Sequence, residues 1–512
     1  MLTNQQKLRY TSITALMLQV TTLVCGFILP KMYLTYYGST VNGLVSSITQ
    51  FLGFIALAEC GVGAVVRSAF YKPLAQKDNY DLSLIVVSSD SFFRKIALLL
   101  AIYVVVLIGV YPFLVSDTFD FIYTESLIAI MSASFFAQYY FGMTSRLLLA
   151  SDQFGFIFLS IQVISLLLNL AISIFLMKHD FSIHFVKLAA SAIFVIQPIA
   201  LYLFVKRKYN IDYSLKPKKD AIPQKWNGFA QHLAAIVLAS SGVVILSIGA
   251  PITLVSVYSI YSLVVIGVKN LVDATTNGFM AYFGNLYALN KLDELKTEFS
   301  KFQWQMHSLV TIVFILTVVL ITPFVAVYTA NITDANYIVP TFGMLFSAAW
   351  GMYCYRLPYS IMVLAVGHYK QTQNSAIIEV LLNVSISVLF FYLWGLEGIA
   401  LGIFISMIYR TVYFANYITK KIFQTSSSYW QKFFGVNAVV ILVFGICYFV
   451  LHDFLAATNV ENFWEWTILA LKNGITVVLI SLLVNMFFFK DYTRGFFNKF
   501  SKLNIFKRKT HS

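Results

Sequence analysis

The feature that most constrains this chain is a succession of long apolar stretches along almost its whole length. About fourteen stretches reach roughly 20 residues, the length that an α-helix needs to cross the hydrocarbon core of a bilayer. Lipid offers no hydrogen-bond partner to an exposed backbone amide, so each stretch is expected to form a helix. The predicted spans are 10–30, 42–66, 95–115, 125–149, 156–177, 184–205, 229–249, 252–280, 305–328, 338–363, 374–394, 398–419, 433–452 and 466–489.

The composition agrees with an integral membrane protein. The 512 residues are 59% hydrophobic and only 11% charged, whereas about 25% of the residues in soluble domains are charged. The first apolar stretch lacks the short hydrophobic segment and small-residue cleavage site of a signal peptide, so it is interpreted as the first span. The four cysteines lie in apolar stretches without metal-ligand or C-x-x-C spacing, so no metal site or cofactor is predicted.

The basic residues alternate between the connections that join the spans. They gather in the two terminal segments and in the connections after the second, sixth, eighth and twelfth spans. The alternate connections 116–125, 328–337 and 452–466 contain none. By the positive-inside rule both termini are cytoplasmic, as an even number of spans requires. The net charge of +14 therefore indicates topology and contact with the anionic inner leaflet, and no nucleic-acid partner is predicted.

Two pairs of segments recur at one offset. The pattern L-L-N-x-x-I-S occurs at 167–173 and again 214 positions later at 381–387. The stretch from Tyr36 to Asp78 has a weaker copy that begins at Gly249, and Lys77 and Lys291 are also 214 apart. The alternative is chance similarity between apolar spans, but a shared offset favours a duplicated unit, as in transporters with parallel repeats.

The predicted fold is therefore an all-α polytopic membrane protein with two pseudo-repeated six-helix lobes and two extra helices. The predicted segments are an N-terminal lobe at 1–205, a cytoplasmic linker at 206–228, a C-terminal lobe at 229–421, extra helices at 422–489 and a basic cytoplasmic tail at 490–512.

A few ionisable side chains fall inside the predicted spans. Each costs about 2.5–3.5 kcal/mol or more in hydrocarbon, so each is a functional hypothesis by default. Lys269 and Asp273 are four positions apart and share a helix face, so they can pair. We expect the charges to face a water-filled cavity between the lobes. The set comprises Glu59, Lys269, Asp273, Arg356, Glu379, Arg410 and Lys472, with Arg67 and Arg146 at span ends.

Structural alternatives stay open for several of these residues. Arg67 and Arg146 have the positions of interface residues whose charged ends reach water. Lys269 and Asp273 also fit a purely structural ion pair, and Glu379 lies near the end of a span, where water can solvate it. A cavity lined by lysine and arginine suits an anionic group such as a phosphate or carboxylate, because arginine makes forked contacts with both.

Several motifs resemble the polysaccharide-exporter branch of the MOP flippase superfamily, which includes the O-antigen, capsule and teichoic-acid repeat-unit flippases. The turn at 37–39 (Tyr-Gly-Ser) opens the second span, and the segment at 58–67 (AECGVGAVVR) is similar to the family's G-[LV]-G-x-A-x-x-R pattern. The run from Tyr71 to Asp78 and the turns at Gly155 and at 367–370 also fit. With the span number and the repeat, the likeness covers most of the chain.

The resemblance implies two lobes around a central cavity and a transporter rather than an enzyme. The implied cargo is an oligosaccharide linked to undecaprenyl pyrophosphate, moved across the bacterial cytoplasmic membrane by alternating access for surface polysaccharide synthesis. Polysaccharide polymerases and glycosyltransferases are the implied partners. In this interpretation Lys269, Arg356 and Arg410 hold the diphosphate, with Arg67 at the cavity mouth. Glu59, Asp273 and Glu379 are candidates to bind a coupling H⁺ or Na⁺.

Two alternatives of the same superfamily remain. Lipid II flippases carry arginines in their first two spans, whereas this chain has no charge in its first span before Lys31. Multidrug antiporters usually have twelve spans, whereas this chain has about fourteen. A glycosyltransferase or polymerase is disfavoured because there is neither a D-x-D-like motif nor a large external loop.

Overall fold

The structure is a computed structural model that describes residues 3–59, 62–218, 229–276, 278–424, 442–443, 445–447 and 460–494. All the regular elements in these residues are helical, and eleven of the helices are long and apolar enough to cross a membrane. The all-helical membrane prediction is therefore confirmed. The first helices are α1 (Asn4–Gly53), α2 (Ala56–Glu59), α3 (Val62–Gln76), α4 (Asn79–Leu114), α5 (Phe121–Ala137), the π-helix η1 (Gln138–Gly142), α6 (Met143–Ser151), α7 (Gly155–Lys178) and α8 (Ile183–Lys208).

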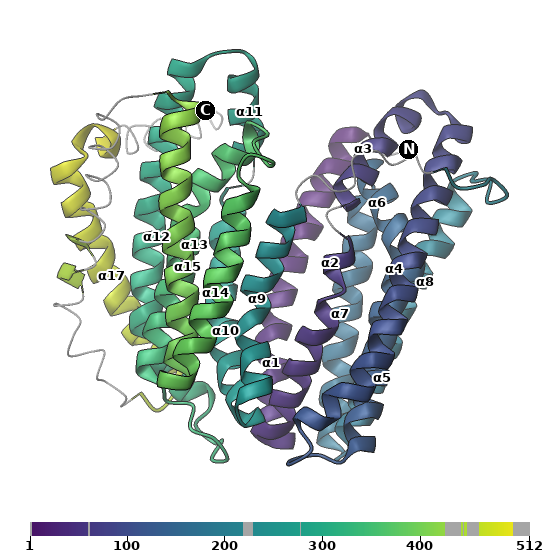
Figure 1. Ribbon diagram of the computed structural model, residues 1–512, viewed down its shortest axis with the longest axis horizontal. Helices are drawn as coiled ribbons and strands as arrows, with labels where there is room; N and C mark the ends of the chain where they lie inside the picture. The colour runs from purple at the N-terminus through teal and green to yellow at the C-terminus, as the bar shows by residue number, and fades with distance from the viewer. Residues whose placement is uncertain are drawn as a thin grey trace, which may run out of the picture. The chain divides into compact units, whose positions relative to one another are not determined.

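The second half of the chain repeats this pattern of long helices with short connections (Figure 1). Its helices are α9 (Phe229–Gly249), α10 (Ile252–Ala274), α11 (Phe279–Ala288), α12 (Leu292–Tyr328), α13 (Pro340–Ala365), α14 (Gln373–Trp394), α15 (Leu396–Tyr417), the π-helix η3 (Ile418–Ile422) and α17 (Phe463–Phe488).

The number of spans differs from the sequence prediction for identifiable reasons. The predicted span 10–30 and most of the predicted span 42–66 fall in one merged apolar segment, Gln5–Glu59. The predicted span 338–363 forms α13, which is not among the eleven apolar helices of the described residues. Most of the predicted span 433–452 lies outside the described residues, as do positions 219–228, 60–61 and the tail from 495. The number fourteen therefore stays a prediction.

The chain forms two compact units. The first contains residues 1–259 and 331–335, and the second contains residues 260–330 and 336–512, so the division falls within α10. The predicted lobe boundaries at 205 and 229 describe the sequence repeat, and they stay a prediction. The described part of the linker, residues 209–218, is held against α4, because the backbone amides of Asp212 and Lys218 donate to Ser83 Oγ and Ser88 Oγ, each at 3.0 Å.

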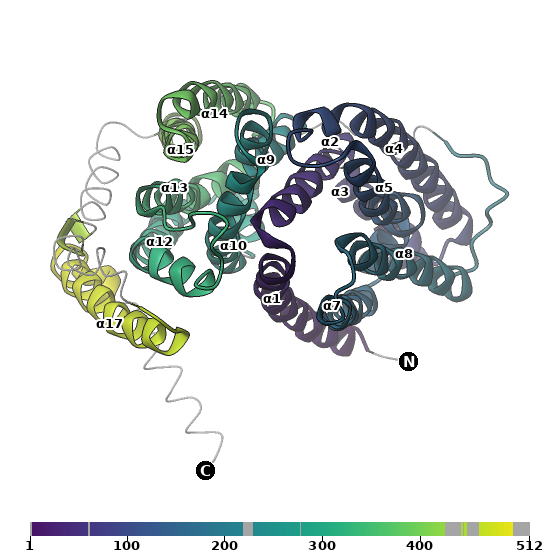
Figure 2. The same ribbon diagram turned by 90° about the horizontal axis from the view of Figure 1, so that it is seen from below.

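Each unit is a bundle in which neighbouring helices pack along their length. In the first unit α1 packs on α7, α7 on α8, α8 on α5 and α5 on α4, an order that is visible in Figure 2. In the second unit α12 packs on α13, α13 on α15 and α15 on α14, while α17 lies against α12. Each unit is therefore held together by contacts between the sides of long helices.

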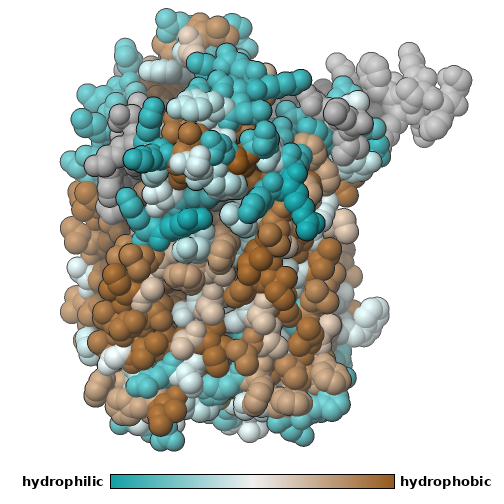
Figure 3. Space-filling model, turned by 90° about the vertical axis from the view of Figure 1, so that its right-hand side faces the viewer, coloured by the Kyte–Doolittle hydropathy of each residue, from teal (hydrophilic) through white to brown (hydrophobic). Residues whose placement is uncertain are grey.

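The outer surface of the bundle suits a lipid environment. Figure 3 shows a broad apolar band between two hydrophilic ends on one face of the molecule. On α4 the exposed residues include the large apolar side chains of Leu98, Ile102, Val105, Val106 and Phe113. Exposed apolar side chains of this size are favourable only where lipid covers them.

The first helix breaks at the glycine that the sequence singled out. Gly38 has φ 77° and ψ 177°, which separates α1 into two helical parts. The second part then starts at Ser39, whose amide and hydroxyl both donate to the carboxylate of Asp334 at 2.6 Å. A carboxylate at a new helix N-terminus satisfies backbone amides that would otherwise lack partners.

The second predicted span forms three separate helices instead of the one continuous helix that its hydropathy predicts. α1 ends at Gly53, a turn occupies Phe54 and Ile55, and the short α2 follows before α3 begins at Val62. The stretch 42–66 contains no charged residue before Glu59, so hydropathy alone did not reveal the break.

The helix bounds recur at the predicted offset of 214 residues. Shifted by this offset, α4 falls on α12, α7 falls on α14, and α8 falls on α15 together with η3. Gln153, with φ 60°, corresponds to Gly367, with φ 76°, so the same left-handed turn precedes α7 and α14. The duplicated unit proposed from the sequence is therefore visible in the local geometry of the two halves.

Candidate functional site

Three of the predicted membrane charges form a buried ion triad in the second unit. Arg356 lies on α13, Glu379 on α14 and Arg410 on α15. Arg356 Nη1 donates to Glu379 Oε1, and Arg410 Nη1 donates to Glu379 Oε2. The side chain of Glu379 has 0% exposure, and each arginine side chain has 6%. One carboxylate is thus shared by two guanidinium groups, which leaves an excess positive charge inside the bundle.

Close helix packing brings the triad together. Gly398 and Gly402 lie one turn apart on α15, and a Cβ atom at Gly402 would approach the Ser387 backbone on α14 to 2.6 Å or less. Small residues at this spacing let two helix backbones approach closely in a membrane. Because α13 packs on the other side of α15, the polar ends of Arg356, Glu379 and Arg410 meet at this helix junction.

A second ion pair lies beside the triad. Lys269 Nζ and Asp273 Oδ2 of α10 are 2.5 Å apart, so the pairing that their spacing indicated is confirmed. The ring of Tyr353 connects this pair to the triad, with its centroid 5.1 Å from Lys269 Nζ and 5.2 Å from Arg356 Cζ. We call these six residues the cationic cluster: Lys269, Asp273, Tyr353, Arg356, Glu379 and Arg410.

The cluster corrects one sequence interpretation. Glu379 was considered as a residue near a span end that water can solvate, but it is fully buried and paired with two arginines. Lys269 and Asp273 are more accessible, with side-chain exposures of 19% and 30%. Asp273 Oδ1 is buried and has no hydrogen-bond partner among the described residues. The accessible side of the cluster is therefore the Lys269–Asp273 pair.

The remaining predicted site residues, Glu59 and Arg67, belong to the first unit. Glu59 ends α2, and a Cβ atom at Gly63 would lie 2.9 Å from its Oε1, so this glycine leaves room for the carboxylate. Arg146 and His232 are the basic residues whose charges act on Glu59. Arg67 is exposed, and its carbonyl accepts a hydrogen bond from Ser151 Oγ at 3.2 Å.

Glu59 and Asp273 occupy equivalent positions in the repeat, since they are 214 residues apart. Tyr139 and Tyr353 are related by the same offset. The charge of Glu59 acts on Tyr139, and the charge of Asp273 acts on Tyr353. Each unit therefore places a carboxylate close to a tyrosine at the same point of its fold. The sequence analysis named both carboxylates but missed the tyrosines, which the offset was sufficient to find.

Comparisons with known proteins show which solved structures share this fold. No known family description matches the sequence, and no curated protein does. The structure of the lipid II flippase MurJ in an inward closed conformation is similar, with a TM-score of 0.66 and 16% identity over 94% of this chain and 99% of the other. An inward-facing multidrug resistance MATE family transporter of the MOP superfamily gives 0.57 and 16% over 78% of this chain and 94% of the other.

A third solved structure, a MOP superfamily transporter from Pyrococcus furiosus, gives a TM-score of 0.53 at 16% identity, over 83% of this chain and 97% of the other. All three proteins are membrane transporters, and in each case the likeness spans most of both chains. The protein is accordingly a multi-pass, all-helical membrane protein with the fold of the MOP superfamily transporters.

Proposed function

We propose that this protein is a flippase that moves oligosaccharide repeat units, linked to undecaprenyl pyrophosphate, from the inner to the outer leaflet of the bacterial cytoplasmic membrane. The observation that carries the proposal is the extent of the shared fold. The lipid II flippase structure corresponds to 94% of this chain, whereas the multidrug transporter corresponds to 78%. Because a carrier of a lipid-linked substrate corresponds to almost the full length of this chain, a lipid-linked cargo is favoured here.

The cationic cluster suits the head group of such a cargo. A diphosphate must leave water to cross the bilayer, so it needs positive charge and hydrogen-bond donors inside the protein. The cluster holds three basic and two acidic side chains, and arginine donates to phosphate oxygens in a forked geometry. In this proposal Lys269, Arg356 and Arg410 receive the diphosphate, and the exposed Arg67 of the first unit is a further cation that attracts it.

Glu379 gives the cluster a means of coupling. While ionised it occupies both arginines, so a bound diphosphate has to compete with it. In this proposal a coupling cation that binds Glu379 and the anionic cargo that binds Arg356 and Arg410 act on the same three side chains, so the binding of one changes the affinity for the other. Glu59 and Asp273, at equivalent positions of the repeat, are the corresponding carboxylates for a second H⁺ or a Na⁺.

Two alternatives share this architecture. A lipid II flippase is favoured by the MurJ likeness itself, and an ion-coupled multidrug antiporter is favoured by the MATE likeness. The absence of any charge between Arg9 and Lys31 in the first apolar stretch is the sequence feature against lipid II. The proposed setting is the cytoplasmic membrane with both termini inside, next to polysaccharide polymerases and glycosyltransferases.

A deletion strain tests the proposal against both alternatives. We expect loss of one surface polysaccharide and accumulation of its undecaprenyl-linked repeat unit on the inner leaflet, measured by mass spectrometry of extracted lipids. Accumulation of lipid II with cell lysis supports the lipid II alternative instead. Unchanged lipid-linked sugars, together with increased drug sensitivity, support the antiporter.

A triple variant separates structural from functional roles of the triad. Replacing a buried ion triad by apolar residues of similar size is often neutral or stabilising, by about 1–4 kcal/mol. We therefore expect Arg356→Met/Glu379→Leu/Arg410→Met to fold with wild-type thermal stability but to restore no polymer export to the deletion strain. Normal export by the folded triple variant removes the triad from the cargo site.

A further inference from the structure

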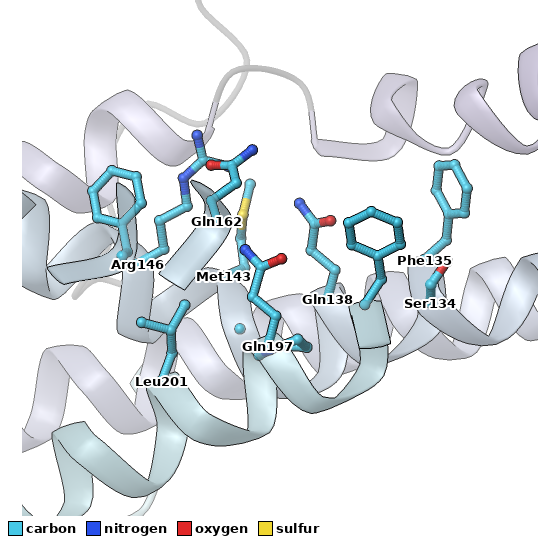
Figure 4. Close-up of a pocket in the computed structure, with 12 residues that line it drawn as sticks. Ser134, Phe135, Gln138, Met143, Arg146, Gln162, Gln197 and Leu201 are labelled. Atoms are coloured by element: carbon cyan, nitrogen blue, oxygen red, sulfur yellow. The ribbon is translucent and has the colours of Figure 1, made fainter. Parts of the chain in front are cut away.

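A polar pocket in the first unit is the strongest feature that the cationic cluster leaves unexplained. It has a volume of about 300 Å³ and is lined by residues of α5, η1, α6, α7 and α8. Three glutamines from three of these elements line it, namely Gln138, Gln162 and Gln197. Figure 4 shows their amides and the Arg146 guanidinium directed into the same space. None of these glutamines was singled out from the sequence.

The three amides are available to a ligand. Within the described part of the chain, no hydrogen bond of these amides to another residue is found. An amide in hydrocarbon without a partner costs several kcal/mol, and here three of them gather on segments that cross the membrane. Because burying such amides in hydrocarbon is costly, they are expected to line a cavity that holds water or a polar ligand.

The backbone around the pocket departs from regular α-helical geometry. The helix that runs from α5 to α6 is wound as a π-helix at Gln138–Gly142, a distortion that often marks functional sites. A Cβ atom at Gly142 would lie 2.6 Å from Pro198 Cβ, so the glycine lets α8 approach. Because Pro198 has no N–H, it cannot donate the usual helical hydrogen bond to the Phe194 carbonyl, and both residues line the pocket.

We infer that this pocket binds one sugar ring of the cargo. The inference rests on the proposed function and concerns the neutral, hydroxyl-rich part of the substrate. Each glutamine amide offers donors and an acceptor, which match sugar hydroxyl and acetamido groups. Phe135, Phe158 and Phe194 supply apolar surface for the C–H face of a pyranose. Arg146, with its Cζ 5.2 Å from the Phe158 ring, provides the cationic end for an acidic substituent.

The experiment measures sugar binding to the full-length protein in a detergent without a sugar head group. The probes are the methyl glycosides of glucose, N-acetylglucosamine and glucuronic acid, detected by saturation-transfer NMR. We expect at least one glycoside to bind the wild type, and Gln162→Leu and Gln197→Leu each to weaken it roughly tenfold, the effect of losing about 1.4 kcal/mol of hydrogen bonding. The matched control is Gln373→Leu, an exposed glutamine at the start of α14, which leaves binding unchanged.

Three outcomes are distinguishable. Absence of binding by any probe to the folded wild type, or equal binding by the pocket variants, overturns the inference. A loss of binding with unchanged flipping of the lipid-linked repeat unit in cells shows that the ligand is a free sugar, which also contradicts it. The proposed function is judged separately by the lipids of the deletion strain, so it can fail while sugar binding and its dependence on Gln162 and Gln197 remain.

Discussion

Glu379 is the residue on which the geometry of the second unit depends most. It has no solvent contact and holds two arginines from two other helices. Taking three charges out of water carries a large desolvation cost, which Coulomb attraction and hydrogen bonds offset only while all three partners are present. The stability of the triad therefore depends on all three side chains. In the proposed function, the triad serves to keep a net positive charge inside the membrane.

Removing the carboxylate charge tests this account. We expect Glu379→Gln to destabilise the protein by about 3–5 kcal/mol, because two buried guanidinium groups lose their counter-charge. Thermal unfolding of the purified protein in detergent measures the effect. Asp293→Asn on α12 is the matched control, since its side chain is fully exposed and its change should leave the melting temperature almost unaltered. Equal melting of the two variants would contradict the burial of the triad.

Lys269 is predicted to behave differently from Arg410. Its pair with Asp273 is more exposed than the triad, so Lys269→Ala should cost less stability than the loss of a fully buried partner does. Arg410→Ala leaves the fully buried Glu379 with one partner and should cost several times more. Both variants should lose polymer export when protein levels are matched. Undiminished export in both, measured by surface polysaccharide staining, removes them from the cargo site.

At the scale of elements, the contact of α14 with α15 is the tightest that the glycines reveal. Gly402→Ala would place a Cβ atom 2.5 Å from the backbone nitrogen of Ser387, so the helices have to separate. Overpacking of this kind costs about 1–3 kcal/mol. Gly109→Ala in α4 is the matched control, because nothing lies within 4 Å of its added atom. It should be neutral or stabilising, by up to about 1 kcal/mol, and melting temperatures decide between these outcomes.

The turn between α13 and α14 carries a pH-sensitive group. His368 Nδ1 lies 3.0 Å from the Tyr417 hydroxyl, and partial burial lowers the pKa of His368 below its usual value of 6.5. The folded state therefore binds this proton less well than the unfolded state does. The corresponding stability is complete above pH 6.5 and is lost as the pH falls towards the lowered pKa.

The wild type should accordingly lose more thermal stability between pH 7.5 and pH 5.5, a range of about two units around the histidine pKa, than His368→Gln does. The glutamine keeps a partner for Tyr417 but does not titrate. Melting temperatures of both proteins at the two pH values provide the comparison, and parallel losses would show that other groups are responsible.

At the scale of the whole molecule, the charge pattern predicts which connections face the cytoplasm. Asp117, in the basic-free connection before α5, and Lys291, in the basic connection before α12, are both exposed. We expect Asp117→Cys to react with a membrane-impermeant maleimide on intact cells and Lys291→Cys to react only after permeabilisation. The described native cysteines Cys25, Cys354 and Cys447 are buried, and the wild type is the control for background. The reverse labelling pattern would invert the proposed direction of transport.

The sequence by itself determined the properties that depend on one segment at a time. Hydropathy over about 20 residues identified helices, because in lipid each helix must satisfy its own backbone. The 214-residue offset identified the duplication, and spacing identified the Lys269–Asp273 pair. Hydropathy also showed that Arg356, Glu379 and Arg410 fall inside predicted spans, because the bounds of a span follow from the local sequence alone.

Only the tertiary structure decided how the helices are rotated about their axes, and therefore which side chains meet. Rotation depends on packing between segments far apart in the chain, such as Gly402 against Ser387. For this reason the sequence did not show that Glu379 is buried between two arginines, or that α1 breaks before Glu59. Nor did it reveal that Gln138, Gln162 and Gln197 line one pocket, since an isolated glutamine in a span carries no sign of its neighbours.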